Sequence, residues 1–228
     1  MDVEVRAIQT KGASNNAIYE MVAKALTECH SGGGVLVDVG CGTGNLWSFV
    51  CGKQSHAEAY STDRYIGVDA VRYDGFPEAA EFILYNLDAG KIPLADGFAD
   101  VVCAVETIEH VENPRAFMRE LVRLTKPGGL AIVTTPNQLS LLSKITLVLK
   151  NQFNAFQESP GLYPAHISAL LEIDLIRIAT ECGLTDIKIH YSNYGRMPFT
   201  PLHWPQSLGF RGRTFSDNIL CVGLKPKV

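Results

Sequence analysis

The strongest constraint on the fold is a short apolar run followed at once by three alternating glycines. Residues 35–39 (VLVDV) have the pattern of a buried β-strand, and Gly40, Gly42 and Gly44 follow it with one residue between neighbours. Glycines let the backbone turn sharply and pass close to a ligand, and a helix predicted at 44–52 adds its free N–H groups. This strand–loop–helix unit predicts a nucleotide-type cradle.

The remaining chain alternates β-rich runs with helical patterns, which predicts a parallel sheet covered by helices. The predicted strands lie at residues 35–39, 65–69, 81–86, 100–105, 129–135, 185–191 and 218–225. The predicted helices lie at residues 15–30, 44–52, 114–125, 138–150 and 167–182. Asn113 can cap the third helix and Gly183 can close the last one. We therefore expect an α/β fold, with residues 1–228 forming a single domain.

Composition excludes several classes of protein. A chain of 228 residues with 46% hydrophobic and 19% charged residues is typical of a globular fold with a sizeable core. A net charge of −4 without a long basic run argues against extended nucleic-acid binding. The N-terminus lacks the apolar core of a signal peptide, no apolar stretch approaches the ~18 residues of a membrane span, and the six cysteines form no Cys-x-x-Cys pair. We expect a cytoplasmic protein with reduced thiols.

Three aspartates lie at or near the ends of successive predicted strands. Asp38 precedes Gly40 by two residues, Asp69 ends the second strand, and Asp88 follows the third. A carboxylate at Asp38 suits a ligand that carries an ammonium group, Asp69 can accept both ribose hydroxyls, and Asp88 can reach an adenine amino group. The G-x-G-x-G spacing departs from the G-x-G-x-x-G of dinucleotide sites, so a nicotinamide dehydrogenase ranks last.

The segments VDVGCGTG, GVD, NLD and KPGGLAIVTTPN, in this order, resemble the class I S-adenosylmethionine-dependent methyltransferases over about residues 33–137. The resemblance implies a Rossmann-like seven-stranded sheet with helices on both faces and an antiparallel last strand. It implies S-adenosylmethionine as the cofactor, with Asp69 on the ribose and Asp88 on the adenine. The other positions that it assigns to the cofactor are Gly40, Cys41, Gly42 and Gly44 around the methionine part, and Val105 and Glu106 beside the fourth strand.

The fourth predicted strand leads into Glu106-Thr107-Ile108-Glu109-His110. A helical turn there would bring Glu106, Glu109 and His110 onto one face, where carboxylates suit Mg²⁺ or Mn²⁺ and an imidazole favours Mn²⁺, Fe²⁺, Co²⁺ or Zn²⁺. Without a metal, they are ordinary polar residues that precede a helix. A similar E-x-x-E-H binds metal with a later histidine in small-RNA 3′-terminal 2′-O-methyltransferases and, more loosely, in ubiquinone-pathway O-methyltransferases. That resemblance implies His166, which lies 56 residues after His110, as a fourth ligand.

Three functions remain open. The leading hypothesis is methyl transfer to a hydroxyl or diol of a small molecule, with a metal activating the hydroxyl or with His110 or His166 taking its proton. The second is 2′-O-methylation of an RNA 3′ end, whose phosphates could meet Arg196, Arg211 and Arg213. The third is a non-catalytic module that binds S-adenosylmethionine.

Acceptor-binding elements are expected outside the segments that carry the resemblance, at residues 1–30, 138–168 and 192–217. The apolar segment 139–153 could rest on a membrane surface, but Lys144 and Lys150 are its only cations. Core packing or a lid over the substrate is the preferred interpretation. The sequence leaves the oligomeric state open.

Overall fold

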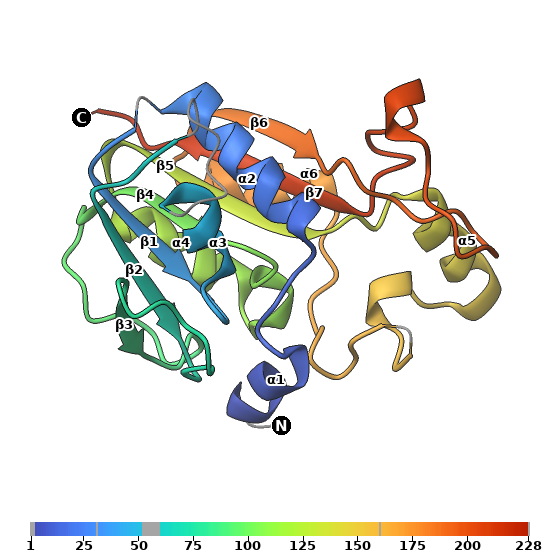
Figure 1. The fold of residues 1–228 in the computed structure, drawn as a ribbon, viewed down its shortest axis with the longest axis horizontal. Coiled ribbons are helices and arrows are strands. Elements are labelled where there is room, and N and C mark those ends of the chain that lie inside the picture. The colour runs from blue at the N-terminus through green and yellow to red at the C-terminus, as the bar shows by residue number, and fades with distance from the viewer. Residues whose placement is uncertain (1–2, 31, 52–59, 160, 228) are drawn as a thin grey trace.

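A mixed seven-stranded sheet lies at the centre of the computed structural model, which describes residues 3–30, 32–51, 60–159 and 161–227 (Figure 1). The strand order is β3-β2-β1-β4-β5-β7-β6, and β7 runs antiparallel to both of its neighbours while the other pairs are parallel. The strands are β1 (Val35–Val39), β2 (Arg64–Asp69), β3 (Glu81–Leu84), β4 (Ala99–Ala104), β5 (Thr125–Pro136), β6 (Thr185–Tyr191) and β7 (Asn218–Leu224). The predicted fold class and the antiparallel last strand are confirmed.

Helices cover both faces of this sheet (Figure 1). The helices are α1 (Val3–Thr10), α2 (Asn16–Cys29), α3 (Asn45–Val50), α4 (Pro114–Leu124), α5 (Leu141–Lys150) and α6 (Glu172–Glu181), with short 3-10 turns η1 (Ile108–His110), η2 (Asn154–Phe156) and η3 (Gln206–Leu208). Side chains alternate along each strand, so Leu36 packs with α2 and α3 while Val37 packs with α4 and α6. Each face of the sheet therefore has its own buried core.

The strand order reverses between β1 and β4, because β2 and β3 lie on one side of β1 and the later strands on the other. In open parallel sheets a crevice forms beyond the carboxyl ends of the strands at such a switch point. The glycine loop after β1 and the Glu106–His110 segment after β4 both begin there. The topology thus brings the two sequence motifs to one edge of the sheet.

Two predicted helix boundaries move for identifiable reasons. The helix expected at 167–182 begins at Glu172, because the backbone N–H groups of Ile167 and Ser168 donate to the Glu109 carbonyl at 2.9 and 3.0 Å. The helix expected at 138–150 begins at Leu141, where the Ser140 hydroxyl accepts from the Ser143 N–H. Residue 52, the predicted end of the helix at 44–52, lies outside the described residues.

The helix α4 begins at Pro114 as predicted and ends at Leu124, one residue before the predicted end, and the strand after it is longer than predicted. The Asn113 side chain accepts from the Ala116 N–H and caps α4, and Pro114 occupies its first turn. The residues that were expected to separate α4 from the fifth strand belong to β5 instead, which begins at Thr125 and not at residue 129.

Residues at the N-terminus form a helix, α1, that sequence patterning did not predict. It packs beside the glycine loop, since the Tyr73 hydroxyl donates to the Ala7 carbonyl at 2.5 Å and the Thr43 N–H donates to the Gly12 carbonyl at 2.8 Å. At eight residues, α1 is too short for apolar periodicity to stand out. The contacts with the loop, and not local propensity, hold this helix in place.

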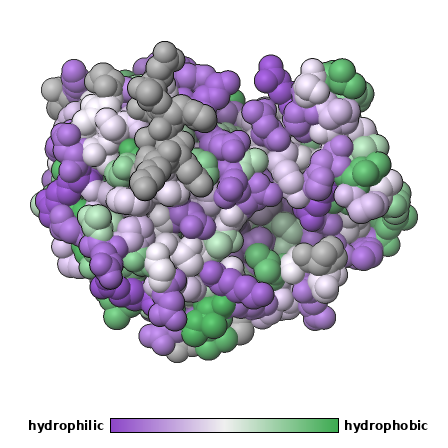
Figure 2. Space-filling model, in the orientation of Figure 1, coloured by the Kyte–Doolittle hydropathy of each residue, from purple (hydrophilic) through white to green (hydrophobic). Residues whose placement is uncertain are grey.

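Of the two interpretations preferred for segment 139–153, core packing is wrong for α5, and a lid over the substrate stays a prediction. Its buried residues are the polar Ser143 and Thr146, whereas Val148 is 83% exposed and Leu149 is 67% exposed. Figure 2 shows hydrophobic side chains at this edge of the molecule. Among the described segments, none of the helices has the length and apolar character that a membrane crossing needs. All six cysteines carry free thiols.

Candidate functional site

A cavity of about 240 Å³ opens at the switch point. Eight of the nine predicted cofactor-binding residues line it, namely Asp38, Gly40, Cys41, Gly42, Asp69, Asp88, Val105 and Glu106. Gly44 is the exception, because it serves as the left-handed N-cap residue of α3. Residues of α1 and of the following turn also line the cavity, among them Thr10, Gly12 and Ser14. The predicted cradle therefore exists and has a wall that the sequence did not reveal.

Two glycines of the loop cannot be replaced by larger residues without rearrangement. Gly40 has φ +78°, and a Cβ there would lie 2.3 Å from the Thr107 hydroxyl oxygen. Gly42 has φ +53°, and a Cβ there would lie 2.2 Å from the Gly12 carbonyl oxygen. Both positions need a left-handed backbone and close packing, which only glycine combines. The loop is thus fixed by its neighbours and not by hydrogen bonds alone.

The acids after β2 and β3 are held by backbone donors. Asp69 is 7% exposed, and its Oδ2 accepts from the Gly42 N–H at 2.8 Å, which ties the end of β2 to the glycine loop. Burial raises the pKa of the Asp69 carboxyl, although backbone donors such as Gly42 partly offset this effect. Asp88 Oδ1 accepts from the Glu112 N–H at 3.0 Å. Both carboxylates line the cavity in fixed orientations.

Asp38 has a buried partner that sequence reasoning missed. Its Oδ2 accepts from the Tyr65 hydroxyl at 2.5 Å, and its Oδ1 has no hydrogen-bond partner among the described residues. Burial raises the pKa of Asp38 to about 7, while the Tyr65 hydrogen bond opposes the rise. The parallel register pairs Asp38 with Gly67, so Tyr65 is its diagonal neighbour on the same face. That register was the signal that could have identified Tyr65.

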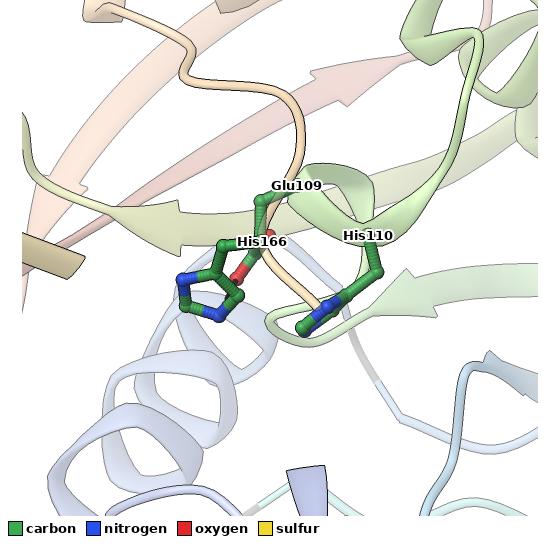
Figure 3. Close-up of side chains that lie close together, drawn as sticks. All are labelled: Glu109, His110 and His166. Carbon is green, nitrogen blue, oxygen red and sulfur yellow. Dashed lines mark ion pairs between the residues drawn. The ribbon is translucent and has the colours of Figure 1, made fainter. Parts of the chain in front are cut away.

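Glu109, His110 and His166 lie together beside this cavity (Figure 3). Each residue offers one ligand atom, and the three atoms lie within 4.8 Å of one another. Glu109 and His110 belong to η1, whereas His166 comes from the segment between η2 and α6. The bonds from Ile167 and Ser168 to the Glu109 carbonyl hold that segment against η1. The structure therefore brings together three of the four predicted metal ligands.

Backbone carbonyls fix the protonation of both histidine rings. Nδ1 of His110 lies 2.9 Å from the Ala165 carbonyl oxygen, and Nδ1 of His166 lies 2.8 Å from the Ala155 carbonyl oxygen. Because a carbonyl only accepts, each Nδ1 carries a proton, and Nε2 keeps a lone pair wherever the ring is neutral. Burial, and then the neighbouring His110, lowers the pKa of His166 to about 3. His166 is therefore neutral at physiological pH, as a metal ligand must be.

Glu109 is a buried carboxyl without a hydrogen-bond donor. It is fully buried, neither oxygen accepts a hydrogen bond from a described residue, and Oε1 lies 3.9 Å from Nε2 of His166. Burial and then the charge of Glu106 raise the pKa of Glu109 well above its ordinary value. A buried acidic group in this state lacks the compensation that such groups usually have.

Glu106 lies outside this group of three. Its Oε1 accepts from the Thr134 hydroxyl at 3.0 Å and its Oε2 from the Asn218 amide at 2.8 Å, and burial raises its pKa to about 7. The expected helical turn from Glu106 to His110 does not form, because Glu106 has φ +50° and η1 begins at Ile108. A place for Glu106 among the metal ligands stays a prediction.

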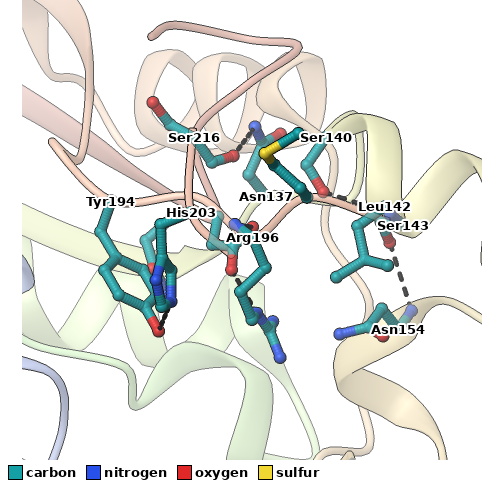
Figure 4. Close-up of polar contacts among 12 residues, drawn as sticks. Asn137, Ser140, Leu142, Ser143, Asn154, Tyr194, Arg196, His203 and Ser216 are labelled. Atoms are coloured by element: carbon teal, nitrogen blue, oxygen red, sulfur yellow. Dashed lines mark hydrogen bonds and ion pairs between the residues drawn. The ribbon is translucent and has the colours of Figure 1, made fainter. Parts of the chain in front are cut away.

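A second cavity, of about 220 Å³, adjoins the first. Five residues line both cavities, namely Asn15, Ile18, Glu106, Leu162 and His166. Most of its lining residues come from the segments expected to bind the acceptor, and Figure 4 shows polar contacts of Asn137, Ser143, Asn154 and Arg196, which all line it. The first cavity thus has the predicted cofactor residues and the second has a polar lining, with His166 between them.

Comparison with known proteins supports the cofactor assignment. A family model described as a methyltransferase domain matches residues 14–189. Norajmaline N-methyltransferase of Rauvolfia serpentina is 27% identical over 190 residues, which are 78% of this chain and 62% of that protein. Probable tocopherol O-methyltransferase of Oryza sativa subsp. japonica is 28% identical over 78% of this chain and 50% of its own length. The chain therefore spans about half to three fifths of the length of these relatives.

Solved structures agree on the fold. A SAM-dependent methyltransferase from Archaeoglobus fulgidus has a TM-score of 0.62 at 18% identity, over 91% of this chain and 94% of that one. The family model covers well over half of the chain, and the sheet has the topology that the resemblance implied. The chain belongs to the methyltransferase domain family, and its fold is that of the class I S-adenosylmethionine-dependent methyltransferases.

Proposed function

We propose that this protein transfers the methyl group of S-adenosylmethionine to a hydroxyl oxygen of a small molecule, and that Glu109, His110 and His166 hold a divalent metal beside that hydroxyl. One observation carries the proposal. Each histidine directs Nδ1 at a backbone carbonyl, so the neutral His166 keeps the lone pair of Nε2, and one ligand atom each of Glu109, His110 and His166 lies within 4.8 Å of the others. Two imidazole nitrogens and a carboxylate oxygen suit Mn²⁺, Fe²⁺, Co²⁺ or Zn²⁺ better than Mg²⁺.

The local electrostatics of this group fit a cation. A positive ion would take the place of the proton that burial favours on Glu109, and it would need no proton to leave the neutral His166. The carbonyls of Ala165 and Ala155 act as outer supports that orient the rings, as the partners of metal-binding histidines commonly do. A bound divalent cation supplies Lewis acidity that lowers the pKa of an acceptor hydroxyl.

The chain's own residues would align the two reactants. Methyl transfer from a sulfonium is an in-line displacement, which requires the hydroxyl oxygen, the methyl carbon and the sulfur to lie on one line. The glycine loop and Asp69 hold one end of the cofactor cavity, while His166 borders both cavities. His166 is a poor general base, since its pKa of about 3 leaves little affinity for a proton at neutral pH. His110 remains the alternative base.

The relatives alone do not select oxygen as the methyl acceptor. One is a norajmaline N-methyltransferase and another a probable tocopherol O-methyltransferase, and a 27% identical ubiquinone biosynthesis O-methyltransferase of Dictyostelium discoideum matches 52% of this chain. The choice of a hydroxyl rests on the metal group, because a neutral amine attacks a sulfonium without this kind of activation.

A chelation experiment tests the metal role. Purified protein is assayed for transfer of a labelled methyl group to a panel of diols, before and after dialysis against EDTA and after re-addition of Mn²⁺, Co²⁺, Zn²⁺ or Mg²⁺. We expect activity to fall at least 100-fold with EDTA and to return with one of these metals. His166→Ala should abolish both metal binding and the response. His30→Ala at the far end of α2 is the matched control and should retain both. Turnover that is indifferent to EDTA would exclude the metal role.

The RNA alternative has less support from the structure. Arg213 pairs with Glu172 through two hydrogen bonds of 2.8 and 2.9 Å, and Arg196 pairs with Asp217. Arg213 is thus engaged with an acid through both Nε and Nη2, whereas Arg196 is engaged through Nε alone. A filter-binding titration of a short RNA across a salt series tests this alternative, because phosphate contacts make affinity fall as salt rises. The non-catalytic alternative predicts cofactor binding without turnover of any acceptor.

A further inference from the structure

The second cavity is lined by Arg196, whose guanidinium is held in place by a hydrogen bond from Nε alone. We propose that this cavity binds an oxyanion, either a carboxylate or a phosphate, carried by the methyl acceptor, and that Arg196 is the residue that recognises it. The proposal rests on the proposed function for the identity of the acceptor, but its anion-binding part can be measured without methyl transfer.

A buried acid holds Arg196 in position. Nε of Arg196 donates to Oδ2 of Asp217 at 2.5 Å, and the backbone N–H of Arg196 donates to Oδ1 at 3.3 Å. Asp217 is 8% exposed and lies directly before β7, whereas the Arg196 side chain is 40% exposed. This arrangement leaves the four N–H groups of Nη1 and Nη2 without a hydrogen-bond partner among the described residues. Those donors belong to a side chain that lines the cavity.

The wall around Arg196 is a connected framework of hydrogen bonds (Figure 4). The Asn137 amide donates to the carbonyls of Arg213 and Ser216 at 2.8 and 2.7 Å, and so joins the end of β5 to the loop before β7. The Ser143 hydroxyl accepts from the Asn154 backbone N–H at 3.3 Å, which joins α5 to η2. A site with walls fixed in this way loses little conformational entropy when a ligand binds.

The carboxyl oxygens that line the cavity are already occupied by donors of the protein. Both oxygens of Asp217 already accept from Arg196, and both oxygens of Glu106 accept from Thr134 and Asn218. The Asn154 side chain also lines the cavity, and its Oδ1 faces the amide of Gln157 at 3.5 Å, which leaves its NH₂ group toward the open space. A ligand that complements such a wall must bring acceptor atoms.

A carboxylate or a phosphate meets this requirement. Each offers two oxygens that match the paired N–H groups of a guanidinium, and these charge-assisted bonds are about twice as strong as neutral ones. A neutral polyol would have to orient its own hydroxyl donors toward a wall that has few unused acceptors. The cavity reaches His166 and Glu106, so an anion at Arg196 and a hydroxyl at the metal group can belong to one molecule.

The anion site is tested first by NMR on the intact protein. The side-chain ¹H–¹⁵N resonance of Arg196 Nε is followed while sodium acetate or inorganic phosphate is added in separate titrations at constant ionic strength. We expect a saturable shift with at least one anion, and the preferred anion identifies the source of the oxyanion. Arg64 is the control, because both of its bonds go to Glu81 and its resonance should not saturate. A shift at Arg196 that is absent, or that merely follows Arg64, overturns the proposal.

Acceptor preference is the second test. Catechol is compared with 3,4-dihydroxybenzoate and with a phosphorylated catechol, using wild-type protein, Arg196→Gln and the control Arg64→Gln. We expect Arg196→Gln to reduce the preference for the anionic acceptor over catechol, measured as a ratio of KM values, at least tenfold, whereas Arg64→Gln keeps the wild-type ratio. An unchanged ratio in Arg196→Gln refutes the assignment. If no acceptor is methylated although S-adenosylmethionine binds, the proposed function fails and the NMR titration alone decides the anion site.

Discussion

Asp38 offers a quantitative test of the cofactor cavity. Its pKa is about 7 in the folded chain, against an ordinary value of 3.8. Each unit of such a difference corresponds to about 1.4 kcal/mol, so ionised Asp38 should destabilise the folded state by about 4 kcal/mol. Below pH 3.8 the carboxyl is protonated in both states and this penalty is absent. The stability that protonated Asp38 retains is therefore lost as the pH rises from about 4 through about 7.

Replacing Asp38 with asparagine should remove this dependence. The asparagine cannot ionise, yet its amide oxygen can still accept from the Tyr65 hydroxyl. Urea unfolding of both proteins between pH 4.5 and 8 gives the difference in their free energies of unfolding. We expect the free energy of unfolding of Asp38→Asn to rise, relative to that of the wild type, by about 3 to 4 kcal/mol between pH 4.5 and pH 8. Tyr65→Phe should raise the pH at which this loss of stability levels off, because it removes the hydrogen bond that lowers the pKa of Asp38. A difference that is flat with pH would refute the reasoning.

Three further predictions concern residues at known contacts. Gly42→Ala should destabilise the protein by about 1–3 kcal/mol and weaken S-adenosylmethionine binding, because the new Cβ would meet the Gly12 carbonyl; unchanged unfolding and calorimetry would contradict this. Asp69→Asn should raise the Kd for the cofactor at least tenfold, because the ribose would lose a charged acceptor. Calorimetry measures this Kd, and an unaltered value would show that Asp69 does not bind the cofactor. Asn113→Ala should cost about 1 kcal/mol through loss of the α4 cap and leave the cofactor Kd as it was; a change in Kd would show a wider effect.

Local sequence signals predicted the features that local chemistry determines. The glycine loop and Asp69 were found because the turn needs left-handed residues and the acid directly ends a strand. The cap at Asn113 was found for a similar reason, since the signal and the helix that it starts are adjacent. In each case the residues that form the feature are neighbours in the sequence, so the sequence pattern was sufficient to predict it.

Features that depend on distant contacts were not predictable in this way. Tyr65 was missed because its bond to Asp38 follows from the register of two strands. The start of α6 was misplaced because Ile167 donates to the Glu109 carbonyl, which competes with the helical pattern. The helical turn expected from Glu106 to His110 did not form, because Glu106 has a left-handed backbone and its side chain accepts from Thr134. His166 entered only through the family resemblance.

The two hydrogen bonds from the backbone N–H groups of residues 167 and 168 to the Glu109 carbonyl affect how acceptor specificity could be redesigned. The stretch that carries His166 also supplies Leu162 to both cavities, so the proposed metal group and the proposed acceptor site share one segment. Grafting this stretch from another enzyme to obtain a new substrate would exchange a proposed metal ligand at the same time. Acceptor selectivity is better altered at the lining residues Asn137, Arg196 and Asp217 of the second cavity, because they lie outside the stretch that carries His166.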